Sequence, residues 1–213
     1  MSSDRVTSVV HLAVYNTLAD WEAGHAVAHI NDPEHQKRPG HYRIRTVGPT
    51  TDVVTTAGGV RIVPDLAIGD LDPDDSAVLI LPGAGAWMTG DLGDFTNAAA
   101  AFLSAGVPVA AICGATVGLA RAGLLDGRRH TSNAAEALSW TGYSGAVNYV
   151  DEPAVTDTST PGHLITAAAM QPVAFAREIF AELDLYTPEV LAAWFRLYSG
   201  DPAGYHDLMA LQA

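Results

Sequence analysis

Short runs of apolar and β-branched residues alternate along the chain with longer alanine-rich segments whose apolar positions have helical spacing. Strands are predicted at residues 8–15, 41–47, 77–81, 107–112, 131–133, 147–150 and 163–168. Helices are predicted after the first strand and at residues 95–105, 117–125, 173–183 and 188–211, with a break at 199–202. This alternation is typical of a mostly parallel sheet with helices on both faces. The predicted fold class is therefore α/β.

Three local patterns refine this prediction. Residues 77–81 (AVLIL) form the most hydrophobic run, which indicates a central strand buried on both faces. Asp20 or Thr17 is expected to cap the helix after the first strand. Residues 53–64 hold two adjacent glycines between short extended runs, which predicts a hairpin. Because no linker or shift in composition is visible, residues 1–213 are predicted to form a single domain, with a helical C-terminal extension from about residue 186.

The charge of the chain limits its partners. The formal net charge is −13, from 24 acidic against 11 basic residues, and the basic residues are scattered, which argues against nucleic acid. No apolar run approaches the ~20 residues of a membrane helix. The first residues lead directly into a predicted strand and not into a signal peptide, so a cytoplasmic location and no membrane partner are expected.

The single cysteine, Cys113, lies at the junction of a hydrophobic strand and a helix. One cysteine forms no intramolecular disulfide and cannot build a zinc ribbon, so its thiol is either a buried packing group or a reactive group. Open α/β folds bind ligands at the carboxyl edge of the sheet, where such a junction exposes its side chain. The N–H groups of the following helix favour the thiolate, which predicts a lowered thiol pKa.

The chain resembles the ThiJ/PfpI superfamily of class I glutamine amidotransferase-like proteins, which includes relatives of a parkinsonism-associated deglycase. The resemblance runs from residue 9 to about residue 183 and rests on four segments in family order: Ala19-Asp20-Trp21-Glu22, Leu81-Pro82-Gly83-Ala84, Ala110-Ala111-Ile112-Cys113-Gly114-Ala115 and Gly127-Arg128-Arg129-His130-Thr131-Ser132-Asn133. It implies a flavodoxin-like three-layer sandwich, a homodimer and a reactive cysteine on a nucleophile elbow.

The resemblance also assigns roles. Cys113 matches the family nucleophile, and Glu22 matches the acid that would exchange protons with it. Ala84 lies in the turn that begins at Gly83, and its backbone N–H, with that of Gly114, would form an oxyanion hole.

Two departures from better-known branches argue against a protease. Gly114 stands where protease-like members have a histidine directly after the cysteine. Asn133 stands where other members have a histidine, and an amide orients a substrate but is no general base. His130 lies three residues earlier, and strand alternation would place it on the opposite face.

Other candidates are weaker. Tyr15 and Asn16, at the end of the first strand, are expected to lie at the active edge and to contact the substrate. His25 and His29 share a helix face, but no third metal ligand is evident, so neither a metal nor a cofactor is expected.

Three hypotheses remain open. The first is an enzyme in which Cys113 attacks a small, neutral electrophile and Glu22 handles protons, as a hydrolase, hydratase or glyoxalase-like or deglycase-like enzyme. The second is a non-catalytic redox or stress-sensing dimer with an oxidisable Cys113. The third is a binding module without chemistry.

Overall fold

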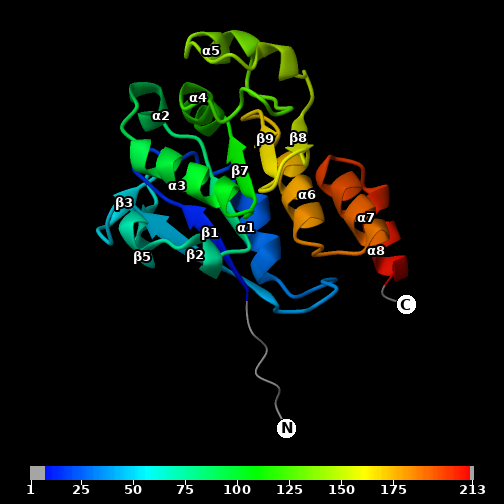
Figure 1. Ribbon diagram of the computed structural model, residues 1–213. Coiled ribbons are helices and arrows are strands. Elements are labelled where there is room, and N and C mark those ends of the chain that lie inside the picture. Colours follow the sequence, from blue (N-terminus) through cyan, green and yellow to red (C-terminus); the bar gives the residue numbers. More distant parts are fainter. Residues whose placement is uncertain (1–7, 212–213) are drawn as a thin grey trace.

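The computed structural model describes residues 8–211 and contains a seven-stranded sheet flanked by helices (Figure 1). The strand order is β5-β2-β1-β6-β7-β9-β8, and all pairings are parallel except that of β8 with β9. The strands of this sheet are β1 (Ser8–Ala13), β2 (Tyr42–Gly48), β5 (Leu66–Ala67), β6 (Val78–Leu81), β7 (Val109–Ile112), β8 (Ala154–Asp157) and β9 (Leu164–Ala167). A separate hairpin, β3 (Val54–Thr55) with β4 (Arg61–Ile62), confirms the hairpin prediction.

Helices form the two outer layers. In Figure 1, α3 and α4 lie on one face of the sheet, while α1 and α6 pack together on the other. The helices are α1 (Gly24–Asn31), α2 (Ala86–Thr89), α3 (Gly93–Ser104), α4 (Gly114–Arg121), α5 (Ala135–Ser139), α6 (Pro172–Glu182), α7 (Pro188–Tyr198) and α8 (Ala203–Leu211), with short 3₁₀ turns at Ile68–Asp70, Pro73–Asp75 and Ala146–Asn148.

The core explains this layering. Every residue of β6, β7 and β9 is buried, as expected for central parallel strands covered on both faces. The α3 and α6 helices each bury one apolar face, which includes Phe102 in α3 and Phe175 in α6. The predicted break near residue 200 separates α7 from α8, and α7 packs on α6.

Two predicted strands are wrong. Residues 131–133 form no bridge, and in residues 147–150 only Tyr149 does, with His130. Side chains satisfy the backbone there, because the Thr131 N–H donates to the Thr166 hydroxyl and the Thr131 hydroxyl donates to the Glu152 carbonyl. The edge strand β8 is not among the predicted strands, because its four residues, AVTD, give little signal.

The predicted cap of α1 is also wrong. The helix begins at Gly24, and Ala23 precedes it without a side-chain cap. Asp20 instead accepts hydrogen bonds from the Thr56 hydroxyl at 2.5 Å and the Gly58 N–H at 2.7 Å, which attach the β3–β4 hairpin to the segment after β1.

No helix among residues 8–211 is long and apolar enough to cross a membrane.

Candidate active site

Cys113 occupies a sharp turn between β7 and α4. Its backbone has φ 58° and ψ −125°, a conformation that non-glycine residues rarely adopt. A Cβ atom on the next residue, Gly114, would lie 3.1 Å from the Ala84 carbonyl oxygen and 3.3 Å from the Trp87 Cβ, so a small residue lets the two turns approach closely. The half-buried thiol therefore lies at the carboxyl end of a central strand.

Glu22 lies next to this thiol. Its side chain is 1% exposed, and its Oε2 accepts a 2.5 Å hydrogen bond from the Gly83 N–H. A Cβ atom on Gly83 would meet Glu22 Oε2 at 2.8 Å and Cys113 Sγ at 3.0 Å, so the carboxyl group, the glycine and the sulfur are in close contact. Glu22 Oε1 is buried and has no hydrogen-bond partner within residues 8–211, and the carboxyl group as a whole interacts with the Cys113 thiol.

Asn133 holds the sulfur from another direction. Its Nδ2 donates to Cys113 Sγ at 3.3 Å, while its Oδ1 accepts from the Ala169 N–H at 2.8 Å. The amide is thereby oriented by the loop after β9. Exposed Trp21 donates from its indole to the Ala169 carbonyl at 3.3 Å and borders the same loop.

These groups come from four adjacent strands. Glu22 follows β1, Gly83 and Ala84 follow β6, Cys113 follows β7, and Ala169 follows β9. Because parallel strands place their carboxyl ends at one edge, residues distant in sequence meet there.

Burial controls the protonation of the site. It raises the pKa of Glu22, and hydrogen bonds from Gly83 and the thiol offset this only in part. Burial also raises the pKa of the Cys113 thiol; the Asn133 amide and the Gly114 N–H lower it, and Glu22 raises it further. The expectation of a lowered thiol pKa is therefore wrong, because burial and a neighbouring carboxyl group outweigh the helix N–H groups.

Tyr15 and Asn16, which were predicted to contact the substrate, make hydrogen bonds within the protein. The Tyr15 hydroxyl is buried and donates to the Pro82 carbonyl, which also accepts from the Trp87 indole at 2.9 Å. Asn16 is exposed, and its Oδ1 accepts from the Thr55 N–H at 2.9 Å, which holds the hairpin. Contact of either residue with a substrate stays a prediction.

His130 is oriented by other groups. Its imidazole is fully buried, with Nδ1 at 2.7 Å from the Arg128 carbonyl and Nε2 at 3.3 Å from the Tyr143 hydroxyl. Burial lowers its pKa. No bond joins it to the Cys113–Glu22 pair among the described residues.

Sequence reasoning missed a buried pair of hydroxyl groups next to the backbone of Cys113. Thr116 Oγ1 donates to the Cys113 carbonyl at 2.6 Å and lies 2.6 Å from Ser132 Oγ. Position 116, three residues after the cysteine in the first turn of a helix, is the one feature that could have suggested this contact.

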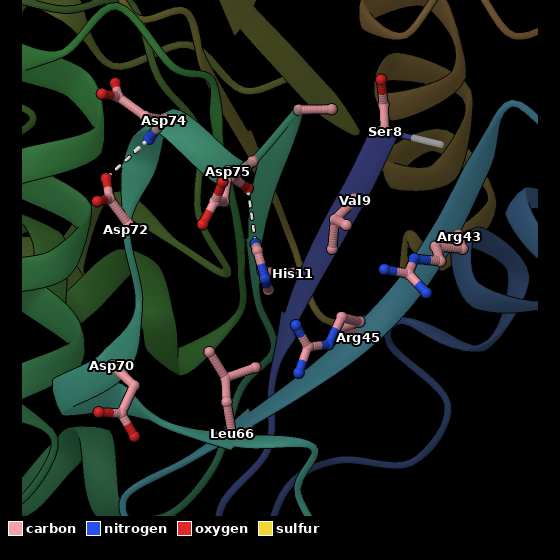
Figure 2. Close-up of a pocket in the computed structure, with 12 residues that line it drawn as sticks. Ser8, Val9, His11, Arg43, Arg45, Leu66, Asp70, Asp72, Asp74 and Asp75 are labelled. Atoms are coloured by element: carbon pink, nitrogen blue, oxygen red, sulfur yellow. Dashed lines mark hydrogen bonds between the residues drawn. The ribbon is translucent and has the colours of Figure 1, made fainter. Parts of the chain in front are cut away.

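A cavity lies at the opposite end of the parallel strands from Cys113 (Figure 2). Its volume is about 500 Å³, and its lining includes Arg43 and Arg45 on one side and Asp70, Asp72, Asp74 and Asp75 on another. It lies near the amino ends of β1 and β2, away from Cys113. Within residues 8–211, no cluster of three or more His, Cys, Asp and Glu side chains could hold a metal ion.

The DJ-1/PfpI family model matches residues 8–182. The chain belongs to the DJ-1/PfpI family. It is 34% identical over 194 residues to a Bacillus subtilis family relative named uncharacterized protease YoaZ, with 90% of each chain covered. It is 30% identical over 126 residues, 59% of this chain, to a Pyrococcus abyssi protein named a deglycase.

Solved structures of the DJ-1/PfpI family confirm the fold. The thiJ/pfpI family protein from Bacillus anthracis superimposes with a TM-score of 0.87 at 35% identity, covering 96% of each chain. The DJ-1 superfamily protein Atu0886 from Agrobacterium tumefaciens gives 0.80 at 31% identity, covering 92% of this chain and 99% of that one. The predicted flavodoxin-like α/β sandwich is thus confirmed across nearly the whole length.

Proposed function

We propose that this protein is an enzyme in which Cys113 attacks a small electrophilic molecule and Glu22 carries the proton. The observation behind this proposal is that the buried Glu22 carboxyl group lies next to the single thiol of the chain. One of its oxygens has no hydrogen-bond partner within the described residues. A carboxyl group whose pKa is raised by burial can accept the thiol proton and later return it.

The reaction begins with transfer of the thiol proton to Glu22. The thiolate is held by the Asn133 amide and attacks an electrophilic carbon, such as that of an aldehyde, and a C–S bond forms as the C=O π electrons move to oxygen. The N–H groups of Ala84 and Gly114, on the two turns beside the sulfur, would donate to that oxyanion. Glu22 then returns the proton to the oxygen, so charge and protons balance.

A neutral substrate fits this scheme best. The protein carries a formal net charge of −13. In addition, the site's buried carboxyl group would repel an anionic substrate. Peptide hydrolysis is less favoured, because His130 is bonded to the Arg128 carbonyl and Tyr143 and does not support the thiol.

The test is turnover of a panel of small aldehydes, amides, nitriles and isocyanides by the wild type, Cys113→Ser and Glu22→Gln. Both variants should lose at least about 100-fold in kcat/KM, because one removes the nucleophile and the other the proton carrier. Asp94→Asn, an exposed acid in α3, is the matched control and should retain wild-type activity. Full activity of Cys113→Ser on a turned-over substrate would exclude the proposal.

Oxidation of Cys113 is the second candidate, and the convergence of Asn133, Gly114 and Glu22 on the sulfur favours it. One peroxide converts the thiolate to a sulfenate and releases water, and a second gives a sulfinate. Mass spectrometry after mild peroxide should show 32 Da added, about two oxygen atoms, on the Cys113 peptide only. An unmodified thiol would exclude this candidate while leaving the catalytic one intact.

A further inference from the structure

A second cavity, made of residues outside the cysteine site, lies between α1, the loop after α1 and the helices α7 and α8. Its volume is about 250 Å³, and its walls include His29, Trp194, Tyr198 and Tyr205. Small-molecule sites are typically concave and lined by apolar and aromatic groups with a few polar ones. This cavity has that composition.

Aromatic rings surround Trp194 in this cavity. Its ring centroid lies 4.9 Å from that of Tyr198, at an interplanar angle of 31°, and 5.2 Å from that of His29, nearly perpendicular. The Tyr198 and His29 centroids are 4.9 Å apart. Three rings from two helices are therefore in mutual contact, and ring faces of this kind attract organic cations.

The indole of Trp194 has an unsatisfied hydrogen-bond donor. Trp194 is 3% exposed, and its Nε1 has no acceptor among residues 8–211. Leaving such a donor unpaired carries a free-energy cost. A ligand that supplies an acceptor would remove this cost.

The rim of the cavity is acidic. Asp32 and Glu34 line it, His35 Nε2 lies 3.8 Å from Glu34 Oε1, and the described lining residues include neither lysine nor arginine. Burial raises the pKa of nearby Tyr186, and the charges of Asp32 and Glu34 raise it further, so their charge reaches the cavity wall. Burial lowers the pKa of His29, which leaves its imidazole neutral near pH 7 and unable to repel a cation.

We propose that this cavity binds a small organic ammonium ion that also carries a hydrogen-bond acceptor, such as an amino alcohol. The rings of Trp194 and Tyr198 would contact the cationic head, Asp32 would complement its charge, and the Trp194 N–H would donate to the acceptor. The volume of about 250 Å³ suits a molecule of this size.

Three related probes separate the elements of the proposal in calorimetric titrations of the full chain. Choline carries both a cationic head and a hydroxyl acceptor, tetramethylammonium has only the cation, and 3,3-dimethylbutan-1-ol has the shape and hydroxyl without the charge. Choline should bind most tightly and the neutral alcohol at least about tenfold more weakly. Equal binding of choline and the alcohol, or no choline binding at about 10 mM, would overturn the proposal.

Variants locate the site. Tyr198→Leu and Asp32→Asn should weaken choline binding about fivefold or more. Trp194→Phe keeps a ring but removes the donor, so it should weaken choline binding by a larger factor than tetramethylammonium binding. Trp140→Phe, at an exposed tryptophan outside this cavity, is its matched control. Wild-type binding by all three cavity variants would place the ligand elsewhere and refute the assignment. Cys113→Ser should bind choline as the wild type does, so this result is independent of the catalytic proposal.

Discussion

The close packing around Gly83 fixes the distance between the Glu22 carboxyl group and the Cys113 thiol. The Gly83 Cα hydrogens face Glu22 and Cys113, where an added methyl group would lie 2.8 Å from Glu22 Oε2 and 3.0 Å from Sγ. Gly83→Ala should therefore push the carboxyl group and the sulfur apart and lower kcat/KM at least about tenfold, since small displacements at reacting atoms are costly.

Gly85→Ala is the control for this substitution. Gly85 has φ −58°, which alanine adopts readily, and its added Cβ would lie 3.6 Å from Thr17 Oγ1. Wild-type kinetics for Gly85→Ala together with a lower kcat/KM for Gly83→Ala would confirm that contact of the added methyl group with Glu22 and Cys113 causes the loss. Equal activity of the two variants would show that the Glu22–Cys113 geometry tolerates displacement.

The Asn133 amide makes a separate prediction about pH. Because its Nδ2 donates to the sulfur, it stabilises the thiolate and lowers the pKa of Cys113. Asn133→Ala should move the inflection of iodoacetamide alkylation, followed by mass spectrometry, to higher pH. Asn97→Ala, at an exposed asparagine of α3, should leave the inflection in place. An unshifted Asn133→Ala profile would show that the Asn133 amide does not stabilise the thiolate.

At the scale of elements, Gln36 secures the end of α1. Its buried side-chain amide donates to the carbonyl oxygens of His29, Ile30 and Asp32, which have no partners within the helix. Gln36→Ala should lower the free energy of unfolding by about 2 kcal/mol, measured by urea denaturation. Gln171→Ala, at a glutamine whose side chain makes no hydrogen bond within the described chain, should change it by less than about 0.5 kcal/mol.

The elements also show what the sequence could predict. The β6, β7 and β9 strands are dense apolar runs, so their burial in the centre of a sheet follows from composition alone. The absence of a strand at residues 131–133 and the missing side-chain cap of α1 could not be predicted, because Thr131 and Asp20 bond to residues remote in sequence. Similarly, the thiol position was predictable from the strand-to-helix junction, but its raised pKa depends on the burial of Glu22 and Cys113.

At the scale of the whole molecule, buried histidines couple stability to pH. Burial lowers the pKa of His11 from 6.5 to about 4, so the folded state holds this imidazole neutral. Stability is complete above the unfolded pKa and falls as the pH drops from about 6.5 to 4, by up to about 3 kcal/mol from this residue. Urea denaturation at several pH values should show a smaller loss for His11→Asn.

The exposed His206 in α8 provides the matched control for that measurement. His206→Asn should keep the wild-type dependence of stability on pH. An identical dependence in His11→Asn and the wild type would mean that His11 is not the group that resists protonation.

The strand order has a consequence for assembly. The two outermost strands are β5, with 2 residues, and β8, with 4, so little unpaired backbone is offered along either margin. Short edge strands limit the pairing of sheets from different molecules, which is a common route to fibrils. If the homodimer that the family resemblance predicts forms, we expect its contacts to come from helices and loops and not from pairing of these edge strands.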